Sequence, residues 1–500
     1  MSLPANIDQL SADELRRLLI EQDRELNWRK VKIDKLTHEV AYYKRHYFGI
    51  KAERLPVEQG QLFEETLAAD MAAITEELAQ LSETKPKGQA KRKPLPPELP
   101  RTEIHHEPES TTCACGCQMK RIGEEVAEKL DYTPGTFTVE RHIRGKWACT
   151  ECETLVQAPV PAHVIDKGIP TTGLLAHVLI AKYLDHLPLY RQEGIFGRAG
   201  LPIPQSTLAE WVGRMGVTLQ PLVDALKEEM LTYPVLHADE TPVAMLDPGA
   251  GKTHRAYLWS YSIGAFEPVK AVVYDFAESR AGKHAREFLG SWRGTLVCDD
   301  YAGYKALIAD GVTEAGCMAH ARRKFFDLHA NNQSQIAQQA LIYIQKLYQA
   351  EREVTGLSPD ERRRIRQQQA KPILDEFHDW LSRHRLQVPN GSSTAKAIDY
   401  SLKRWTALAH YLDDGQVPID NNWIENRIRP IATGRKNWLF AGSLRAGKRA
   451  AAIMSLIQSA KLNGHDPFLY LKDILARLPI QPNSRIGELL PHRWLPNTSP

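Results

Sequence analysis

Three acidic side chains, far apart in the sequence, are the residues best suited to chemistry. Asp239 ends the apolar run YPVLHAD, Asp299 ends the run GTLVCD, and Glu425 lies in PIDNNWIENRIRP. Functional groups of open sheets are usually found where an apolar strand stops. Mg²⁺ prefers carboxylate ligands, and two ions about 4 Å apart can promote attack on a phosphodiester and stabilise the leaving oxygen. The pattern is compatible with a two-metal site for phosphodiester chemistry.

The segment around Glu425 also has a simpler interpretation. A helix that Asn421 or Asn422 opens and Pro430 limits would bury one face, formed by Ile424, Ile428 and Ile431. Glu425 and Arg429, four residues apart, would then form a surface ion pair worth roughly a few tenths of a kcal/mol. Taken alone, these residues favour the surface pair.

Five of the seven cysteines lie between residues 113 and 152. Cys149 and Cys152 form a C-x-x-C knuckle, and Cys113, Cys115 and Cys117 offer a second pair of thiols. In a reducing compartment such a cluster is typical of a metal site rather than of disulfides. The turn sequence KLDYTPGTF between the two groups predicts a hairpin, so we expect a small zinc module with four thiolate ligands. The spacing does not decide which of the first three cysteines is spare.

The composition is that of an ordinary protein of several domains. The chain has 500 residues, of which 43% are hydrophobic and 25% charged, and its formal net charge is +3. This charge permits nucleic-acid binding without demanding it. No apolar run approaches the roughly 20 residues that span a bilayer. The polar N-terminus does not resemble a signal peptide, so we expect a cytoplasmic protein with no membrane partner.

A heptad pattern marks the N-terminal segment. Leu19, Leu26, Ile33, Val40 and Tyr47 are each seven residues apart. This repeat predicts a coiled coil, although a long amphipathic helix packed on its own protein is the alternative. The Pro-rich, basic segment that follows is typical of an extended linker.

A helical region precedes the first β-rich segment. Two helices joined by a Gly-Leu-Pro turn resemble a helix-turn-helix, whose second helix would enter the major groove of DNA. Its leading residues would be Gln205, Ser206 and Thr207. A plain helical hairpin explains the same residues equally well.

From residue 231 onward short β-rich runs appear. Three neighbouring strands, a helix, a fourth strand and a further helix are the order of an RNase H-like core, a mixed sheet flanked by helices. In such a core Asp239 and Asp299 lie close together, and a helical insertion separates them from Glu425. We therefore expect a multidomain α+β protein with these parts: coiled-coil helix 8–52, linker 83–100, zinc module 101–165, helix-turn-helix-like domain 166–230, RNase H-like core 231–330 and 416–444, all-helical insertion 331–415 and C-terminal helices 445–480.

One further motif points to a different enzyme class. The run GSLRAGKR nearly matches a phosphate-binding P-loop, which would indicate a nucleotide-driven enzyme. Arg449 occupies the place where the motif requires a metal-binding Ser or Thr. We therefore reject this interpretation.

Four segments together carry a resemblance to a known family. HADETP, CDDYAGY, GCMAHARRKFFD and NNWIENRIRPIATGRKNWLFAGS resemble the transposases of the insertion sequence 66 family, a group of bacterial DDE transposases. The resemblance covers nearly the whole chain. It implies that Asp239, Asp299 and Glu425 are the catalytic residues and hold two Mg²⁺ or Mn²⁺ ions. It also gives the isolated Glu425 a role that the local sequence does not.

The same resemblance implies the remaining site residues. Where the family commonly has Asp-Gly-Tyr, this chain has Asp299, Asp300 and Tyr301. Successive strand side chains point to opposite faces, so only one of the two aspartates can bind the metal, and we choose Asp299. Further expected roles are structural zinc binding by Cys113, Cys115, Cys149 and Cys152, with Cys117 as a possible substitute; phosphate contact by Arg429, Arg435 and Lys436; and active-site support by Cys317 and His320.

The activity that the resemblance implies is DNA transposition in the bacterial cytoplasm. Water would cleave a phosphodiester at each transposon end, and the freed 3′-hydroxyl would attack target DNA. The expected partners are transposon-end and target double-stranded DNA, further copies of the chain in a homodimer or higher multimer, and accessory proteins of the same element. The alternative is a non-catalytic, zinc-containing DNA-binding regulator. That alternative gives no reason for acids at two strand ends.

Overall fold

The structure is a computed structural model that describes residues 11–49, 68–78, 95–108, 110–112, 114, 117–133, 135–159, 162–165, 168–247 and 252–496. The chain forms two compact units. The first comprises Met1–Leu130, Pro134–Gln157 and Leu189–Val217, and the second comprises Asp131–Thr133, Ala158–Pro188 and Thr218–Pro500. Within the described residues, no helix combines the length and the apolar character needed to cross a bilayer.

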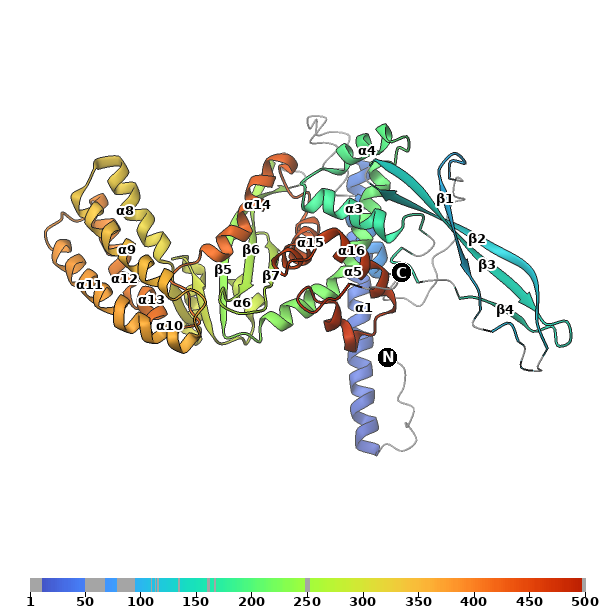
Figure 1. Cartoon of the computed structure of the whole chain (residues 1–500), viewed down its shortest axis with the longest axis horizontal. Coiled ribbons are helices and arrows are strands. Elements are labelled where there is room, and N and C mark those ends of the chain that lie inside the picture. Colours follow the sequence, from blue (N-terminus) through green and yellow to red (C-terminus); the bar gives the residue numbers. More distant parts are fainter. Residues whose placement is uncertain are drawn as a thin grey trace. The chain divides into compact units, whose positions relative to one another are not determined.

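A single long helix, α1 (Ala12–Gly49), covers most of the segment with the heptad pattern (Figure 1). Leu19 and Leu26 on its predicted seam are 68% and 54% exposed, whereas Leu36 is buried. The predicted helix is thus confirmed. An apolar stripe left in water is what a helix that pairs with another chain would show, so the coiled coil stays a prediction.

A separate sheet in the first unit contains the predicted cysteine module. Its strand order is β1-β3-β2, with β4 paired to β3. The turn between β2 and β3 contains Gly135, whose φ of +86° favours glycine, and it forms the hairpin that the turn sequence predicts. The strands are β1 (Arg101–His106), β2 (Lys120–Thr133), β3 (Thr136–Ala148) and β4 (Leu155–Gln157).

Three helices occupy the region predicted to bind DNA. They are α3 (Thr172–Tyr183), α4 (Leu189–Arg198) and α5 (Gln205–Met230). Helix α3 packs on α16 (Pro467–Arg477) in the second unit, whereas α4 and the beginning of α5 belong to the first unit. The helices expected to form one domain are therefore divided between the units.

The second unit is built on a five-stranded mixed sheet of order β7-β6-β5-β8-β9. Strands β5, β6 and β7 pair antiparallel, and β5, β8 and β9 pair parallel. A mixed sheet with helices on it agrees with the predicted α+β class. The strands are β5 (Val235–Asp247), β6 (Lys252–Ile263), β7 (Val272–Ala277), β8 (Thr295–Cys298) and β9 (Thr313–Gly316).

The open edge of β7 is covered by helix α15 (Leu444–Leu462). Ser455 Oγ accepts a hydrogen bond from the Tyr274 N–H at 2.8 Å, and Ser459 Oγ accepts one from the Val272 N–H at 3.0 Å. These bonds satisfy backbone donors that an exposed edge strand would offer to another chain. The same helix contains the P-loop-like run from Leu444 onward, so those residues form a packed helix and not a phosphate-binding loop.

The insertion is all-helical, as predicted. Its helices lie together at one side of the sheet in Figure 1 and share one apolar cluster with Val297 and Ala315 of β8 and β9. A π-helical turn at Arg366–Ala370 joins α10 to α11. The helices are α8 (Met318–Asn332), which precedes the insertion, and α9 (Gln335–Glu353), α10 (Pro359–Ile365), α11 (Lys371–Arg385), α12 (Ser393–Lys403) and α13 (Trp405–Ala409).

Helix α14 (Asn422–Trp438) carries Glu425 and differs from expectation at its end. The prediction that Pro430 limits the helix is wrong, because α14 continues for two further turns. Proline there removes one backbone hydrogen bond, but the flanking apolar face anchors the helix on both sides of it. That face is the predicted one, with Ile424, Ile428 and Ile431 all buried.

Candidate active site on the mixed sheet

Strand β5 positions Asp239 near the point where the pairing of β5 with β8 stops. The strand runs to Asp247, so the prediction that it ends at Asp239 is wrong. Its parallel pairing with β8 nevertheless covers only Val235, Leu236 and His237. Asp239 therefore lies just past the point where its neighbour strand stops. Its Oδ1 accepts a hydrogen bond from the Glu240 N–H at 2.8 Å, and its side chain is half-buried.

Asp299 and Asp300, which follow β8, have different partners. Asp299 Oδ1 accepts a hydrogen bond from the Tyr301 N–H at 3.0 Å. Asp300 instead forms ion pairs with Arg404 from the helical insertion and, at 3.9 Å, with Lys305. Asp299 thus stays at the strand end, whereas Asp300 is part of a salt-bridge group that fixes the insertion to the sheet.

Asn421 fastens the start of α14 to β5. Its side-chain N–H₂ donates to the Ala238 carbonyl at 2.9 Å, and its Oδ1 lies 2.7 Å from His237 Nδ1. Burial lowers the pKa of His237 to about 4, so this imidazole is neutral at physiological pH and can donate to the amide oxygen. These contacts fix Asn421 to the residue that precedes Asp239, and Glu425 lies one turn further along α14.

Several nearby acids act electrostatically on Asp239. Burial raises the pKa of Asp239 well above its usual range, and the negative charges of Glu240, Asp299 and Glu425 raise it further. Neither Asp239 nor Asp299 has a salt-bridge partner among the described residues. Like charges that share a half-buried site are stabilised when a cation binds between them. Carboxylate oxygens are a donor set that fits Mg²⁺ or Mn²⁺.

Glu240 is a second buried acid on β5 that the sequence analysis did not single out. Its side chain is fully buried and pairs with Arg280 at 2.5 Å, and Tyr304 Oη donates to it at 2.8 Å. The Arg280 guanidinium lies 3.9 Å from the ring centre of Tyr301, which follows the two aspartates. In the sequence, its position beside Asp239 in HADETP could have pointed to Glu240. In the structure, Glu240 ties β5 to the loop after β8 through Arg280 and Tyr304.

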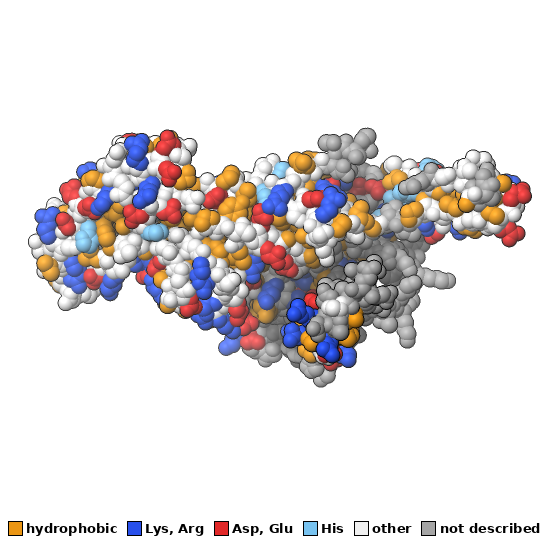
Figure 2. All heavy atoms as spheres, turned by 90° about the horizontal axis from the view of Figure 1, so that it is seen from below, with side chains coloured by type: hydrophobic (Ala, Val, Ile, Leu, Met, Phe, Trp, Pro, Cys, Tyr) orange, Lys and Arg blue, Asp and Glu red, His pale blue; other side chains and the backbone are white. Residues whose placement is uncertain are grey.

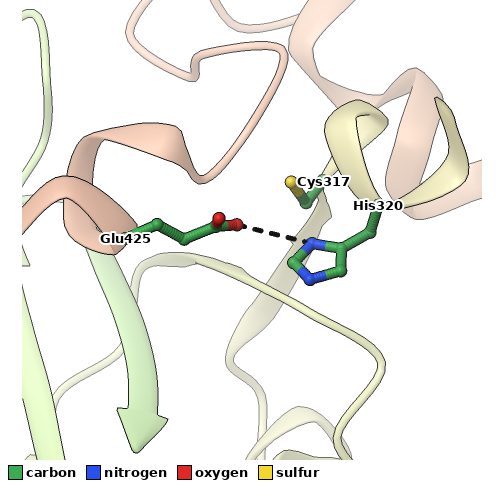
Figure 3. A group of neighbouring side chains, drawn as sticks. All are labelled: Cys317, His320 and Glu425. Atoms are coloured by element: carbon green, nitrogen blue, oxygen red, sulfur yellow. Dashed lines mark ion pairs between the residues drawn. The ribbon is translucent and has the colours of Figure 1, made fainter. Parts of the chain in front are cut away.

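Cys317 and His320 lie directly beside Glu425, as Figure 3 shows. The His320 Nδ1 and the Glu425 Oε1 are 3.6 Å apart. Among the described residues, one group of three metal-type ligand atoms lies within 4.8 Å of one another, and it consists of Cys317, His320 and Glu425. The two aspartates do not belong to this closest group. The structure therefore brings Glu425 within electrostatic range of Asp239 and into close contact with Cys317 and His320.

The basic residues predicted to contact phosphate lie on α14. Arg429 and Lys436 are exposed to solvent, so their charges are accessible. Arg435 is half-buried, and its guanidinium donates to the Pro242 carbonyl and, at 3.3 Å, to the Thr241 hydroxyl of β5. Arg435 thus fixes α14 to the sheet through the same group that was expected to meet DNA.

A basic cleft opens beside the start of α14. Its volume is about 670 Å³, and helices α8 and α9 form its walls. The Arg322 guanidinium lies 5.6 Å from the ring centre of Phe326, which is exposed. Three arginines and one aspartate line the cleft, so it carries a net positive charge. Elsewhere on the visible face of the insertion, acidic and basic side chains are interspersed (Figure 2). Its lining comprises Ala319, Arg322, Arg323, Phe326, Asp327, Leu341, Gln345, Tyr348, Arg352 and Asn422.

In the first unit, three of the five clustered cysteines are described. Cys117 precedes β2 and packs on the small cluster of Met119 and buried Cys149. Cys149 opens a tight turn, in which its N–H and carbonyl bond to Thr154 and Glu153, and exposed Cys152 lies within this turn. Cys113 and Cys115 lie outside the described residues.

The residues predicted to lead into the major groove form the first turn of α5. The helix begins at Gln205, and the N–H groups of Thr207 and Leu208 both bond to the Pro204 carbonyl. Ser206 is exposed, and Gln205 and Thr207 are half-buried.

Comparison with known families agrees with the order of these parts along the chain. Residues 167–449 match the model described as the Transposase IS66 family. The chain belongs to the IS66 transposase family. Residues 110–153 match the zinc-finger binding domain of transposase IS66, and residues 455–492 match the IS66 C-terminal element. Residues 35–104 match a model described as Transposase C of IS166 homeodomain. The family predicted from the four sequence segments is thereby confirmed. The match of residues 110–153 to the zinc-finger domain supports a zinc site.

Similar proteins occur in Sinorhizobium fredii (strain NBRC 101917 / NGR234). The uncharacterized protein y4jD is 38% identical over 419 residues, which cover 80% of this chain and 81% of y4jD. The uncharacterized protein y4qI is 36% identical over 485 residues, which cover 93% of this chain and 90% of y4qI. These two proteins thus resemble the chain over four fifths of its length or more.

Proposed function

We propose that this chain is a DDE-type DNA transposase that cleaves DNA at transposon ends and joins the freed 3′-hydroxyl to target DNA. The observation that carries the proposal is the placement of three acids: Asp239 lies just past the end of the β5–β8 pairing, Asp299 directly follows β8, and Asn421 fastens the helix of Glu425 to β5. These three acids come from two strands and a distant helix, and only the fold brings them within electrostatic range. Membership of the IS66 family supports the same conclusion.

The sheet topology supports an RNase H-like catalytic core as part of this proposal. Three antiparallel strands are followed by two parallel ones, and the insertion and α14 come after them. Asp239 lies on β5, Asp299 directly follows the neighbouring strand β8, and Asn421 fastens the helix that carries the third acid. A distant segment of the chain thereby completes the site.

The residues of the chain would hold and orient the reacting DNA. In the proposal, Asp239, Asp299 and Glu425 hold two Mg²⁺ or Mn²⁺ ions, which would supply Lewis-acid stabilisation of phosphodiester oxygens when bound. Asp299 is the metal ligand in this proposal. Asp300 has a structural role, because it already forms ion pairs with Arg404 and Lys305.

Further residues on α14 and around it would bind the DNA. Arg429 and Lys436 would contact its phosphates, and the basic cleft would hold one strand near the cut. Arg435 would act from its bonds to β5, as a residue that positions α14.

The first unit would recognise DNA and organise the complex. Cys149 and Cys152, with two of Cys113, Cys115 and Cys117, would bind a structural zinc ion. The packing of Cys117 against Cys149 favours Cys117 as one of these two. The first turn of α5 would contact double-stranded DNA, and α1 would pair with a second copy of the chain. Accessory proteins of the same element remain proposed partners.

A cleavage assay tests the proposal. The full chain is mixed with double-stranded DNA that carries both ends of its own element, with Mg²⁺, Mn²⁺ or EDTA. We expect nicking at the ends with either metal and none with EDTA. The variant Asp239→Asn, which keeps the shape of the side chain and removes its charge, should bind the same DNA in a gel-shift experiment and not cut it.

The alternative is a zinc-containing regulator that binds DNA without catalysis. Sequence-specific binding by the wild type with no nicking in either metal would favour this regulator and refute the transposase. Loss of DNA binding together with cleavage in Asp239→Asn would instead show that Asp239 has a structural role.

A further inference from the structure

The group formed by Cys317, His320 and Glu425 has the composition of a metal site that the proposed Mg²⁺ chemistry does not use. Cys317 immediately follows β9 and caps α8, and His320 lies in the first turn of that helix. Glu425 reaches them from α14, as Figure 3 shows. One ligand atom of each residue lies within 4.8 Å of the other two. Two segments that are remote in sequence thus present sulfur, nitrogen and oxygen to one point.

Two of these ligand atoms lack hydrogen-bond partners. Among the buried polar atoms of the described residues, His320 Nδ1 and Glu425 Oε1 both have none. Their separation of 3.6 Å is too long for a hydrogen bond between them. Buried polar atoms in native proteins are almost always satisfied, by protein groups, water or an ion. An ion held between them would satisfy both.

We propose that Cys317, His320 and Glu425 bind a transition-metal ion of the Zn²⁺ class. Zn²⁺ accepts thiolate, imidazole and carboxylate ligands together, whereas Mg²⁺ requires oxygen ligands. Three protein ligands with a fourth position open to water are a coordination that Zn²⁺ commonly adopts. His320 and Glu425 have side chains that are 26% and 22% exposed, so the fourth position is accessible from solvent.

The surrounding structure is suited to hold a thiolate. The Asn421 N–H donates to the Cys317 sulfur at 3.2 Å, and this bond strengthens when the sulfur is charged.

The site shares Glu425 with the proposed catalytic centre. Asp239 and Asp299 offer only oxygen, and Cys317 and His320 offer sulfur and nitrogen, so Glu425 lies between ligands of two kinds. An ion that takes Glu425 on the Cys317 side withdraws it from the aspartates. Zn²⁺ should therefore inhibit Mg²⁺-dependent cleavage, a consequence that rests on the proposed function, whereas binding of the ion does not.

Cobalt binding to the full chain tests the site directly. Co²⁺ bound to a thiolate shows a sulfur-to-metal charge-transfer absorption, and the cysteine module contributes the same signal in every variant. Cys317→Ser should lose part of this absorption and one equivalent of bound metal relative to the wild type. His320→Ala should weaken the same binding step at least tenfold.

Two matched variants serve as controls. Cys298→Ser removes another buried thiol outside the group, and His329→Ala removes another histidine of α8. Both should keep the wild-type metal content and absorption. Equal metal content and equal absorption in the wild type and in folded Cys317→Ser would overturn the site, and thermal melting of each variant verifies that it is folded.

A cleavage titration tests the competition separately. Each protein is assayed in Mg²⁺ with increasing Zn²⁺, and its rate is normalised to its own rate without Zn²⁺. Wild type should be inhibited at Zn²⁺ concentrations at least tenfold lower than Cys317→Ser. Equal sensitivity of the two would overturn the competition. Absence of Mg²⁺-dependent cleavage in the wild type would refute the proposed function, and the cobalt result would still decide the metal site.

Discussion

Buried charge is arranged differently in the helical insertion and around Asp239 on the mixed sheet. In the insertion, the Arg366 guanidinium is fully buried and donates to both Glu351 oxygens at 2.7 and 2.6 Å. It also donates to the carbonyls of Tyr411 and Val417 at 2.7 and 2.9 Å. At the edge of β5, Asp239 accepts one bond from its neighbour's N–H and is surrounded by further acids.

This contrast distinguishes structural from functional charge. A buried charge that serves the fold has its opposite charge and its hydrogen bonds within the chain, because an unpaired buried charge destabilises the folded state. A group of acids that repel one another destabilises the fold until a cation binds, and such groups concentrate at functional sites. The centre of the insertion has the first arrangement, and the site around Asp239 has the second.

The largest expected effect separates two adjacent aspartates. Asp299→Asn should slow DNA cleavage by about 10³-fold or more, equivalent to about 4 kcal/mol of transition-state stabilisation. Asp300→Asn should slow it by less than about tenfold, because Asp300 is bound to Arg404 and Lys305 and Arg404 retains Glu314 at 2.7 Å. Initial rates at saturating Mg²⁺ measure both. The reverse ranking would show that Asp300 is the metal ligand.

The next effect concerns the charge at the centre of the insertion. Arg366→Met should lower the free energy of unfolding by about 3–5 kcal/mol, because it leaves Glu351 buried without its partner. Lys371→Met is the matched control, since its ion pair with Asp375 is exposed and should contribute less than about 1 kcal/mol. Urea unfolding measures both changes. If Arg366→Met lowered the free energy of unfolding no more than Lys371→Met does, the insertion would tolerate an unpaired Glu351.

A smaller effect is expected in the basic cleft. Replacing Arg322 and Arg323 by alanine should weaken binding of end DNA and reduce the slope of log affinity against log salt by about 2, one for each lost phosphate contact. Arg363→Ala on α10, an exposed arginine outside the cleft, should leave the slope unchanged. Fluorescence anisotropy between low and physiological salt measures the slope. An unchanged slope in the double variant would exclude the cleft as a phosphate-binding surface.

The smallest effect is a pH dependence of stability. The pKa of Asp239 is higher in the folded protein than in the unfolded chain, so this residue favours folding at low pH and the contribution disappears as pH rises through the folded value. In EDTA, Asp239→Asn should therefore gain thermal stability relative to wild type as pH rises, by about 2–4 °C. Adding Mg²⁺ should stabilise the wild type selectively and reduce the gain. A difference that is constant with pH would contradict the assigned pKa direction.

Local sequence patterns predicted most of the elements but not their limits. The buried stripe of Ile424, Ile428 and Ile431 identified α14, because a helix repeats every 3.6 residues and its apolar face must pack. The same pattern could not show that α14 continues through Pro430, since packing on both sides of the proline compensates for the lost hydrogen bond. The end of β5 was missed for a related reason: pairing with β6 continues to Asp247 although pairing with β8 stops at His237.

The sequence by itself determined which residue types are present in which order, and that was enough to identify the family and to nominate its three acids. The tertiary structure alone decided the partner of each charge. It assigned Arg404 to Asp300, Arg280 to Glu240, and Cys317 and His320 to Glu425. The physical reason is that the energy of a charge depends on its distance to other charges and on its exclusion from water, and both quantities are set by segments remote in sequence.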